Sequence, residues 1–119
     1  MHRAAPTFEE HIEILVIESP SALILEWGRR LELALKNYRK VLRLEDNPWG
    51  DFAGVLQADR LVGPEVSAQI IDLRNRRNEV AHEAPKCLPA DDTIQYARKA
   101  EDIVWLLGRA KDIKEGRVF

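Results

Sequence analysis

Hydrophobic residues recur along this 119-residue chain at the three- and four-residue spacing of amphipathic helices, and the pattern predicts five helices and no strands. The most regular run starts at Ser19-Pro20, a favoured N-cap residue followed by a favoured first helical residue. Its apolar positions continue for six turns: Leu23, Trp27, Leu31, Ala34 or Leu35, Tyr38, and Val41 or Leu42.

Turn and capping signals divide the flanking sequence. The stretch Thr7-Phe-Glu-Glu10 has the form of a capping box and predicts a short first helix over residues 8–18. Residues 46–50, Asp-Asn-Pro-Trp-Gly, have the composition of a loop. The apolar residues between Phe52 and Leu61 then suggest a short third helix.

Two further helices fill the second half of the chain. The fourth begins at Gly63-Pro64, has apolar residues at Val66, Ile70, Ile71 and Leu73, and stops near Ala84-Pro85. The fifth follows Pro89, where aspartates meet the positive end of the helix dipole. Its apolar stripe is Ile94, Ala97, Ala100 or Glu101, Val104, and Leu107 or Gly108. We therefore expect a single all-α domain over residues 1–119, an antiparallel helical bundle of four to five helices.

Composition limits the function of this bundle. Hydrophobic residues make up 45% and charged residues 32%, as in a globular protein. The net charge is −2, whereas a chain that holds duplex nucleic acid by general attraction is normally basic, so a nucleic-acid role needs a local patch. Cys87 is the single cysteine, which excludes an intrachain disulfide. With no signal peptide or membrane span in the sequence, we expect a cytoplasmic protein.

A polar cluster in the predicted fourth helix is the main candidate for chemistry. At 100° per residue, Arg74, Asn78 and His82 follow one another along a single stripe, with Arg77 and Ala81 beside it. A guanidinium matches phosphate oxygens, and an imidazole can transfer a proton near neutral pH. Two converging copies of this cluster are enough for phosphodiester chemistry without a metal.

A structural explanation of the same cluster stands beside the catalytic one. Cations and a histidine in the last turn of a helix are favoured by the helix dipole alone. In that case Arg76 pairs with Asp72 at i,i+4 spacing and His82 caps backbone carbonyls.

The segment from Arg77 to His82 resembles the R-polar-x3-H signature of the HEPN superfamily, helical-bundle domains named for higher eukaryotes and prokaryotes nucleotide-binding. Its context is similar as well, with Leu73-Arg74 before it and an alanine-rich helix after it. The pattern from Ser19 to Glu32 looks like the long second helix of small bacterial HEPN proteins. The resemblance covers about residues 8–110.

The resemblance implies a metal-independent endoribonuclease without a cofactor that acts as a homodimer, often a toxin of a toxin–antitoxin system or a phage-defence effector. Arg77 would hold and polarise the scissile phosphate, Asn78 would orient the phosphate or the histidine, and His82 would transfer protons. Arg74 would help to bind the RNA substrate. The dimer mate would supply the second proton-transfer group, and products would carry 2′,3′-cyclic phosphates.

Two features bear on the choice between active and silent members. Some toxins of this kind have a tyrosine two residues after the histidine, which a nucleotidyltransferase antitoxin modifies, but this chain has Ala84 there. Other members are catalytically inactive and serve as protein- or nucleotide-binding or dimerisation modules. The alternative function is therefore a silent bundle of that type, and an antitoxin or nucleotidyltransferase is the partner expected for a toxin.

The remaining histidines and aromatic residues give weaker signals. His2 and His11 are expected to be inert, and no metal-ligand spacing occurs around them. Among residues able to stack on bases, Trp27 and Trp105 are expected to pack in the core, whereas Trp49 in the Pro-Trp-Gly segment is the stronger candidate.

Overall fold

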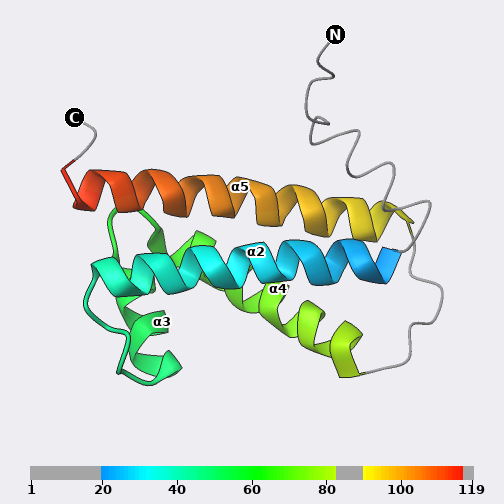
Figure 1. The fold of residues 1–119 in the computed structure, drawn as a ribbon, viewed down its shortest axis with the longest axis horizontal. Coiled ribbons are helices and arrows are strands. Elements are labelled where there is room, and N and C mark those ends of the chain that lie inside the picture. Colours follow the sequence, from blue (N-terminus) through cyan, green and yellow to red (C-terminus); the bar gives the residue numbers. More distant parts are fainter. Residues whose placement is uncertain (1–19, 83–89, 117–119) are drawn as a thin grey trace, which may run out of the picture.

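A computed structural model describes residues 20–82 and 90–116 of the chain. These ranges contain helices and no strand, which confirms the predicted all-α class (Figure 1). The helices are α2 (Pro20–Val41), α3 (Trp49–Ala58), α4 (Gly63–His82) and α5 (Ala90–Lys114). The expected first helix, residues 8–18, lies outside the described residues, together with His2, His11, Ala84 and Cys87.

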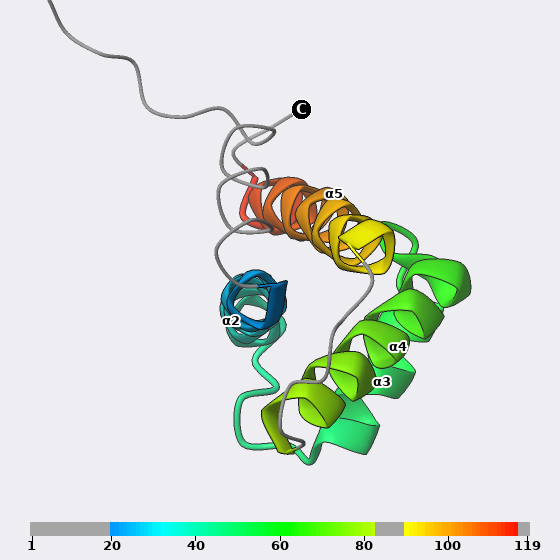
Figure 2. The ribbon, with the colours of Figure 1, turned by 90° about the vertical axis from the view of Figure 1, so that its right-hand side faces the viewer.

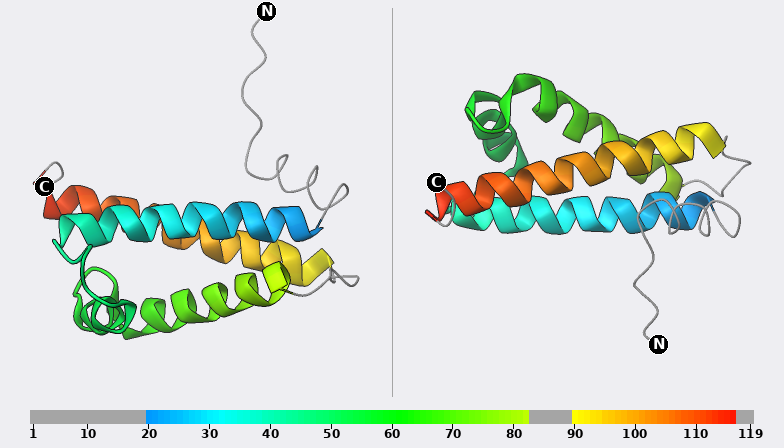
Figure 3. Two further views of the ribbon diagram at one scale, coloured as in Figure 1. Left: turned by 60° about the horizontal axis from the view of Figure 1, so that its bottom comes forward. Right: turned by 90° about the horizontal axis from the view of Figure 1, so that it is seen from above.

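Of the three long helices in the described ranges, α4 runs antiparallel to the α2–α5 pair. Helices α2 and α5 lie side by side, run in the same direction and form the largest interface, whereas α4 runs in the opposite direction (Figure 1). Seen along α2, helix α4 lies across one side of the α2–α5 pair and α3 packs against α4 (Figure 2). The end of α4 and the start of α5 lie at the same end of the molecule (Figure 3).

One hydrophobic core joins the described helices. Its buried side chains from α2 include Leu23, Ile24, Trp27, Leu31, Leu35 and Tyr38; those from α3 are Phe52 and Leu56; those from α4 are Ile70 and Leu73; and those from α5 include Tyr96, Ala97, Ala100, Ile103, Leu107 and Ala110. Ile70 and Leu73 are buried and Val66 packs partly buried against them, so these residues anchor the fourth helix as expected.

Helix α3 starts earlier than predicted, because Trp49 and Gly50 are helical rather than part of a loop. It also ends earlier, at Ala58. Pro48 stands at the N-cap with φ −58° and ψ 154°, a position where its missing N–H costs no helical hydrogen bond. At the other end the backbone of Asp59 is extended, and the carboxylate Oδ1 of Asp59 accepts the Leu61 N–H at 2.8 Å. This hydrogen bond satisfies the Leu61 N–H, which would have bonded to a backbone carbonyl if the helix had continued.

The carboxylate of Asp59 also ties three helices together. The Tyr38 hydroxyl of α2 donates to Asp59 Oδ2 at 2.5 Å, and Lys114 Nζ of α5 lies 3.7 Å from the same oxygen. Burial by itself raises the pKa of Asp59, but the hydrogen bonds from Tyr38 and the Leu61 N–H, together with the charge of Lys114, hold it below its usual value. Asp59 therefore stays charged although it is buried.

The packing of the two core-phase tryptophans differs. Trp27 is buried as expected, but the prediction for Trp105 is wrong, because 69% of this side chain is exposed. The inward stripe of α5 includes Ile103 and Leu107, and a residue two positions from each points to the opposite side of the helix. The predicted apolar stripe of α5 is wrong by one position at Ile94 and Val104, which are only partly buried, whereas Thr93 and Ile103 are buried.

Candidate functional site

The four predicted site residues all belong to the second half of α4, so the polar cluster lies in a helix as expected. Asn78 is exposed, and Arg74 and Arg77 are partly buried. His82 is the last residue of α4, and its side chain lies outside the described part of the structure. These residues do not share one environment, because α4 turns Arg77 inward and Asn78 outward.

Arg77 continues the inward stripe of α4. It follows Ile70 by seven residues, which is two helical turns, and its stem lies against Gly28 of α2. A Cβ atom placed on Gly28 would stand 2.4 Å from Arg77 Cδ and 2.8 Å from Cγ. Only a glycine at this position leaves room for the side chain of Arg77 as it lies here.

Two polar groups near this contact are buried without a hydrogen-bond partner among the described residues. They are the Nε–H of Arg77 and the hydroxyl of Tyr96 on α5. Burial raises the pKa of Tyr96 to about 12; the positive charge of Arg77 opposes this rise and the negative charge of Glu32 adds to it. Tyr96 is therefore neutral at physiological pH. It lies close enough to Arg77 for the charge of the guanidinium to lower its pKa. Unsatisfied buried donors are rare in proteins and cost about 1–3 kcal/mol each.

Arg74 is held by contacts to two other helices. Its Nε donates to Glu32 Oε1 of α2 at 2.5 Å, and its guanidinium carbon lies 3.7 Å from the centroid of the Trp49 ring of α3. Planar stacking on the indole combined with a charge-assisted hydrogen bond fixes the guanidinium. These contacts leave only the remaining donors of the Arg74 guanidinium for any other partner.

Arg76 bridges the end of α4 to the start of α5. Its terminal nitrogen lies 3.7 Å from Asp92 Oδ2, so the described ion pair is with Asp92 rather than with Asp72 as the structural explanation expected. Both side chains are well exposed, so the pair contributes little to stability. It does bring a carboxylate of α5 toward the polar cluster.

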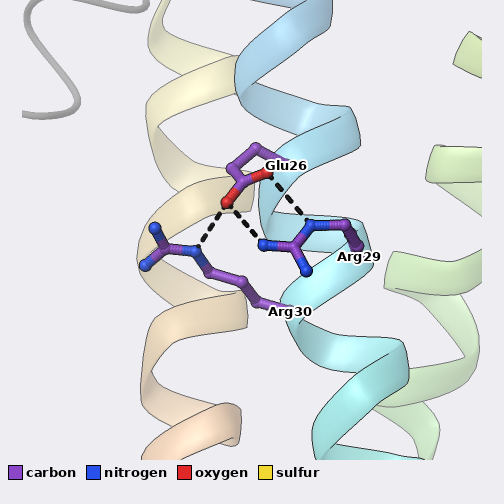
Figure 4. A network of polar contacts seen from close by, with 3 residues as sticks. All are labelled: Glu26, Arg29 and Arg30. Atoms are coloured by element: carbon purple, nitrogen blue, oxygen red, sulfur yellow. Dashed lines mark hydrogen bonds and ion pairs between the residues drawn. The ribbon is translucent and has the colours of Figure 1, made fainter.

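A second charged group lies on α2, where Glu26 stands between the guanidinium groups of Arg29 and Arg30 (Figure 4). The Glu26–Arg29 and Glu26–Arg30 hydrogen bonds are 3.0 Å long, and Arg30 also lies 4.5 Å above the Trp27 ring. Hydrogen bonds from Arg29, then from Arg30, lower the pKa of Glu26 to about 2. This network holds the guanidinium groups of Arg29 and Arg30 against the carboxylate of Glu26 on α2.

Sequence reasoning did not find Gly28, Glu32 and Tyr96 as neighbours of the cluster. One signal was present, because Gly28 stands on the same stripe as Ile24, Leu31 and Leu35, and a glycine inside an apolar stripe indicates close approach of another element. Tyr96 and Glu32 carried no such signal.

No family model, curated protein or solved structure matches this chain. Within residues 20–82 and 90–116, no helix has both the length and the apolar character needed to cross a bilayer. In the same ranges, no three His, Cys, Asp or Glu side chains gather as ligands of one metal ion.

Proposed function

We propose that the protein is a metal-independent endoribonuclease of the HEPN type that acts as a homodimer, as a toxin or phage-defence effector. The observation that carries the proposal is Arg77, whose Nε–H is buried on the inward stripe of α4 with no acceptor among the described residues. A phosphate oxygen is an acceptor that matches a guanidinium in both charge and geometry.

Arg77, Asn78 and His82 take different roles in this proposal. The ribose 2′-hydroxyl attacks phosphorus, its proton passes to a base, and the 5′-oxygen leaves with a proton from an acid. His82 serves one of these two transfers and the dimer mate supplies the group for the other. Arg77 stabilises the negative charge that develops on the phosphorus oxygens, and Asn78 orients the phosphate.

The test is RNA cleavage by the purified protein and its variants. We expect His82→Ala to lower the rate by about 100- to 10,000-fold, the usual worth of general acid–base catalysis. Arg77→Lys should also be poor, because an ammonium group cannot make the two-pronged phosphate contact. Chelators should leave cleavage intact, and products should end in 2′,3′-cyclic phosphates.

Matched controls separate catalysis from folding in this experiment. His11→Ala removes a histidine from outside α4, and Arg60→Lys alters an exposed arginine away from the cluster. Both should cleave RNA like the unchanged protein. The enzyme function would be refuted if RNA cleavage survived His82→Ala, or if no preparation of the dimer cleaved RNA.

A silent binding module is the second candidate, and the contacts of Arg74 favour it. Its guanidinium is already stacked on Trp49 and hydrogen bonded to Glu32, an arrangement typical of a structural arginine. Under this alternative α4 binds a protein or nucleotide partner, and His82→Ala changes affinity without any effect on RNA.

A further inference from the structure

A partly exposed ion pair joins α2 to the polar cluster of α4. The Nε–H of Arg74 donates to Glu32 Oε1 at 2.5 Å, and the two side chains are 29% and 34% exposed. A guanidinium binds carboxylate and phosphate oxygens with the same donors. Because solvent reaches the pair, a second anion can compete with the carboxylate of Glu32 for Arg74.

The pair lies in a groove of about 560 Å³, here called the α2–α3 groove, which opens between α2, α3 and the side of α4. The other cations of this groove are Arg29, Lys36 and Arg39, and its other carboxylate is Glu45. Four cationic and two anionic side chains therefore line the groove, although the net charge of the chain is −2. This local excess of positive charge attracts an anionic strand to the place where the pair lies.

Trp49 of α3 holds the guanidinium of Arg74 by a contact that does not involve Glu32. The guanidinium carbon lies 3.7 Å from the centroid of the Trp49 ring. That ring meets the buried ring of Phe52 edge to face, with centroids 5.4 Å apart and an interplanar angle of 74°. A guanidinium that is stacked on a fixed ring keeps its place when its hydrogen-bond acceptor changes. One anion can therefore replace another on Arg74 without a new ordering of the side chain.

The charge of Glu32 also acts near the residue proposed to bind the scissile phosphate. Burial raises the pKa of Tyr96 on α5 to about 12, and the charges of Arg77 and Glu32 act on the same hydroxyl in opposite directions. Both charges therefore lie near one point of the bundle. A phosphate bound by Arg77 is repelled by the carboxylate of Glu32.

We propose that Glu32 is an intramolecular competitor of the RNA backbone: its carboxylate occupies Arg74 in the free protein, and a phosphate of the bound strand takes its place on the guanidinium. Glu32 and Trp49 are then positioning residues, which act through Arg74 and take no part in proton transfer. The inference rests on the proposed ribonuclease function and deepens it, because it identifies the contact that RNA must displace at α4.

Binding of a single-stranded 2′-O-methyl RNA, measured by fluorescence anisotropy at several salt concentrations, tests the exchange. This RNA lacks the attacking 2′-hydroxyl, so it reports on binding alone. Glu32→Gln should raise the affinity about tenfold, because RNA no longer has to break a charge-assisted hydrogen bond. Arg74→Gln should lower the slope of log affinity against log salt by about 0.7, the value for one phosphate contact on a single strand.

Glu45→Gln is the matched control. It removes a carboxylate of the same groove that forms no ion pair with another described residue, so it changes the charge of the groove without releasing an arginine. Its effect on affinity should be far smaller than that of Glu32→Gln. In an Arg74→Gln background the two glutamate substitutions should have equal effects. Circular dichroism checks the folding of each variant.

Cleavage of unmodified RNA gives a second readout. Glu32→Gln should lower KM about tenfold and leave kcat unchanged, because the carboxylate acts on binding and not on the chemical step. A lower kcat, equal effects of the two glutamate substitutions in the unaltered chain, or a salt slope unchanged by Arg74→Gln would overturn the exchange.

The exchange and the ribonuclease function can fail separately. If Glu32→Gln strengthens RNA binding but no variant cleaves RNA, the ribonuclease function is refuted and the exchange stands. If the unaltered protein cleaves RNA and Glu32→Gln does not strengthen binding, the exchange is refuted and the ribonuclease function stands. Absence of RNA binding by every variant would refute both.

Discussion

Arg77 occupies a position on α4 that an apolar residue would normally fill. Its stem packs on Gly28, and its Nε–H is buried without an acceptor among the described residues. Burial of a donor that stays unpaired destabilises a fold by about 1–3 kcal/mol. A bound anion would supply an acceptor for this donor, which is why the proposed function gives Arg77 the central binding role.

Substitution of Gly28 by alanine tests this close approach. Alanine is favoured over glycine in a helix by up to about 1 kcal/mol, but here its Cβ would meet Arg77 and displace it, at a cost of about 1–3 kcal/mol. Gly108→Ala is the matched control, because a Cβ at Gly108 of α5 meets nothing within 4 Å. Urea denaturation should give Gly28→Ala a lower free energy of unfolding than Gly108→Ala.

The same change in an Arg77→Ala background provides the internal check. With the arginine stem removed, Gly28→Ala should stabilise the protein as Gly108→Ala does. Identical effects of the two glycine substitutions in the unaltered chain would show that Arg77 does not lie against Gly28.

At the level of the helices, the sequence predicted most where apolar spacing was regular. Helix α2 starts at Pro20 as expected, and Ile70 and Leu73 bury the predicted face of α4. The register of α5 was less well defined, because its core side includes alanines while the large apolar Trp105 faces solvent. The stack of Arg74 on Trp49 depends on tertiary structure, and no local pattern signals it.

Tyrosine ionisation gives a test at this scale, because Tyr38 joins α2 to the end of α3 and Tyr96 belongs to α5. Burial raises the pKa of both, that of Tyr96 to about 12, above the value of about 10 for an exposed tyrosine. A raised pKa contributes stability that is complete below pH 10 and is lost as the pH rises through the folded value. We expect helix content and tyrosinate absorbance to change together above pH 10.

The chain has only two tyrosines, so their signals can be separated. In a Tyr38→Phe variant the remaining transition belongs to Tyr96 and should lie near pH 12 while the bundle is folded. A tyrosine that ionises near pH 10 with the helix content unchanged would contradict the burial described here.

For the whole molecule, the most exposed large apolar side chain among the described residues is Trp105, and it lines a groove of about 470 Å³ between α2 and α5 together with Leu33. Glu101 lies in this groove with Arg30 and Lys111, so the surface carries both charges. A groove that exposes a large aromatic side chain is a candidate contact surface for the second copy that the proposed homodimer requires.

Light scattering at micromolar concentration should therefore report a dimer that Trp105→Arg converts to monomer. A central tryptophan of an interface commonly contributes 2 kcal/mol or more, a loss of about thirtyfold in affinity. Ile71→Arg on α4 is the control, because Ile71 is 43% exposed and lies outside the groove. A monomeric unaltered protein would count against the composite catalytic site.

The neighbouring positions of α2 and α5 have a consequence for biosynthesis. α2 ends at Val41 and its main packing partner begins at Ala90, so a ribosome that has reached His82 has made α4 and the polar cluster but not α5. Until α5 emerges, the apolar side of α2 lacks most of its cover, so the bundle that positions α4 is incomplete. The RNA cleavage proposed for this protein should therefore begin only after α5 has been synthesised.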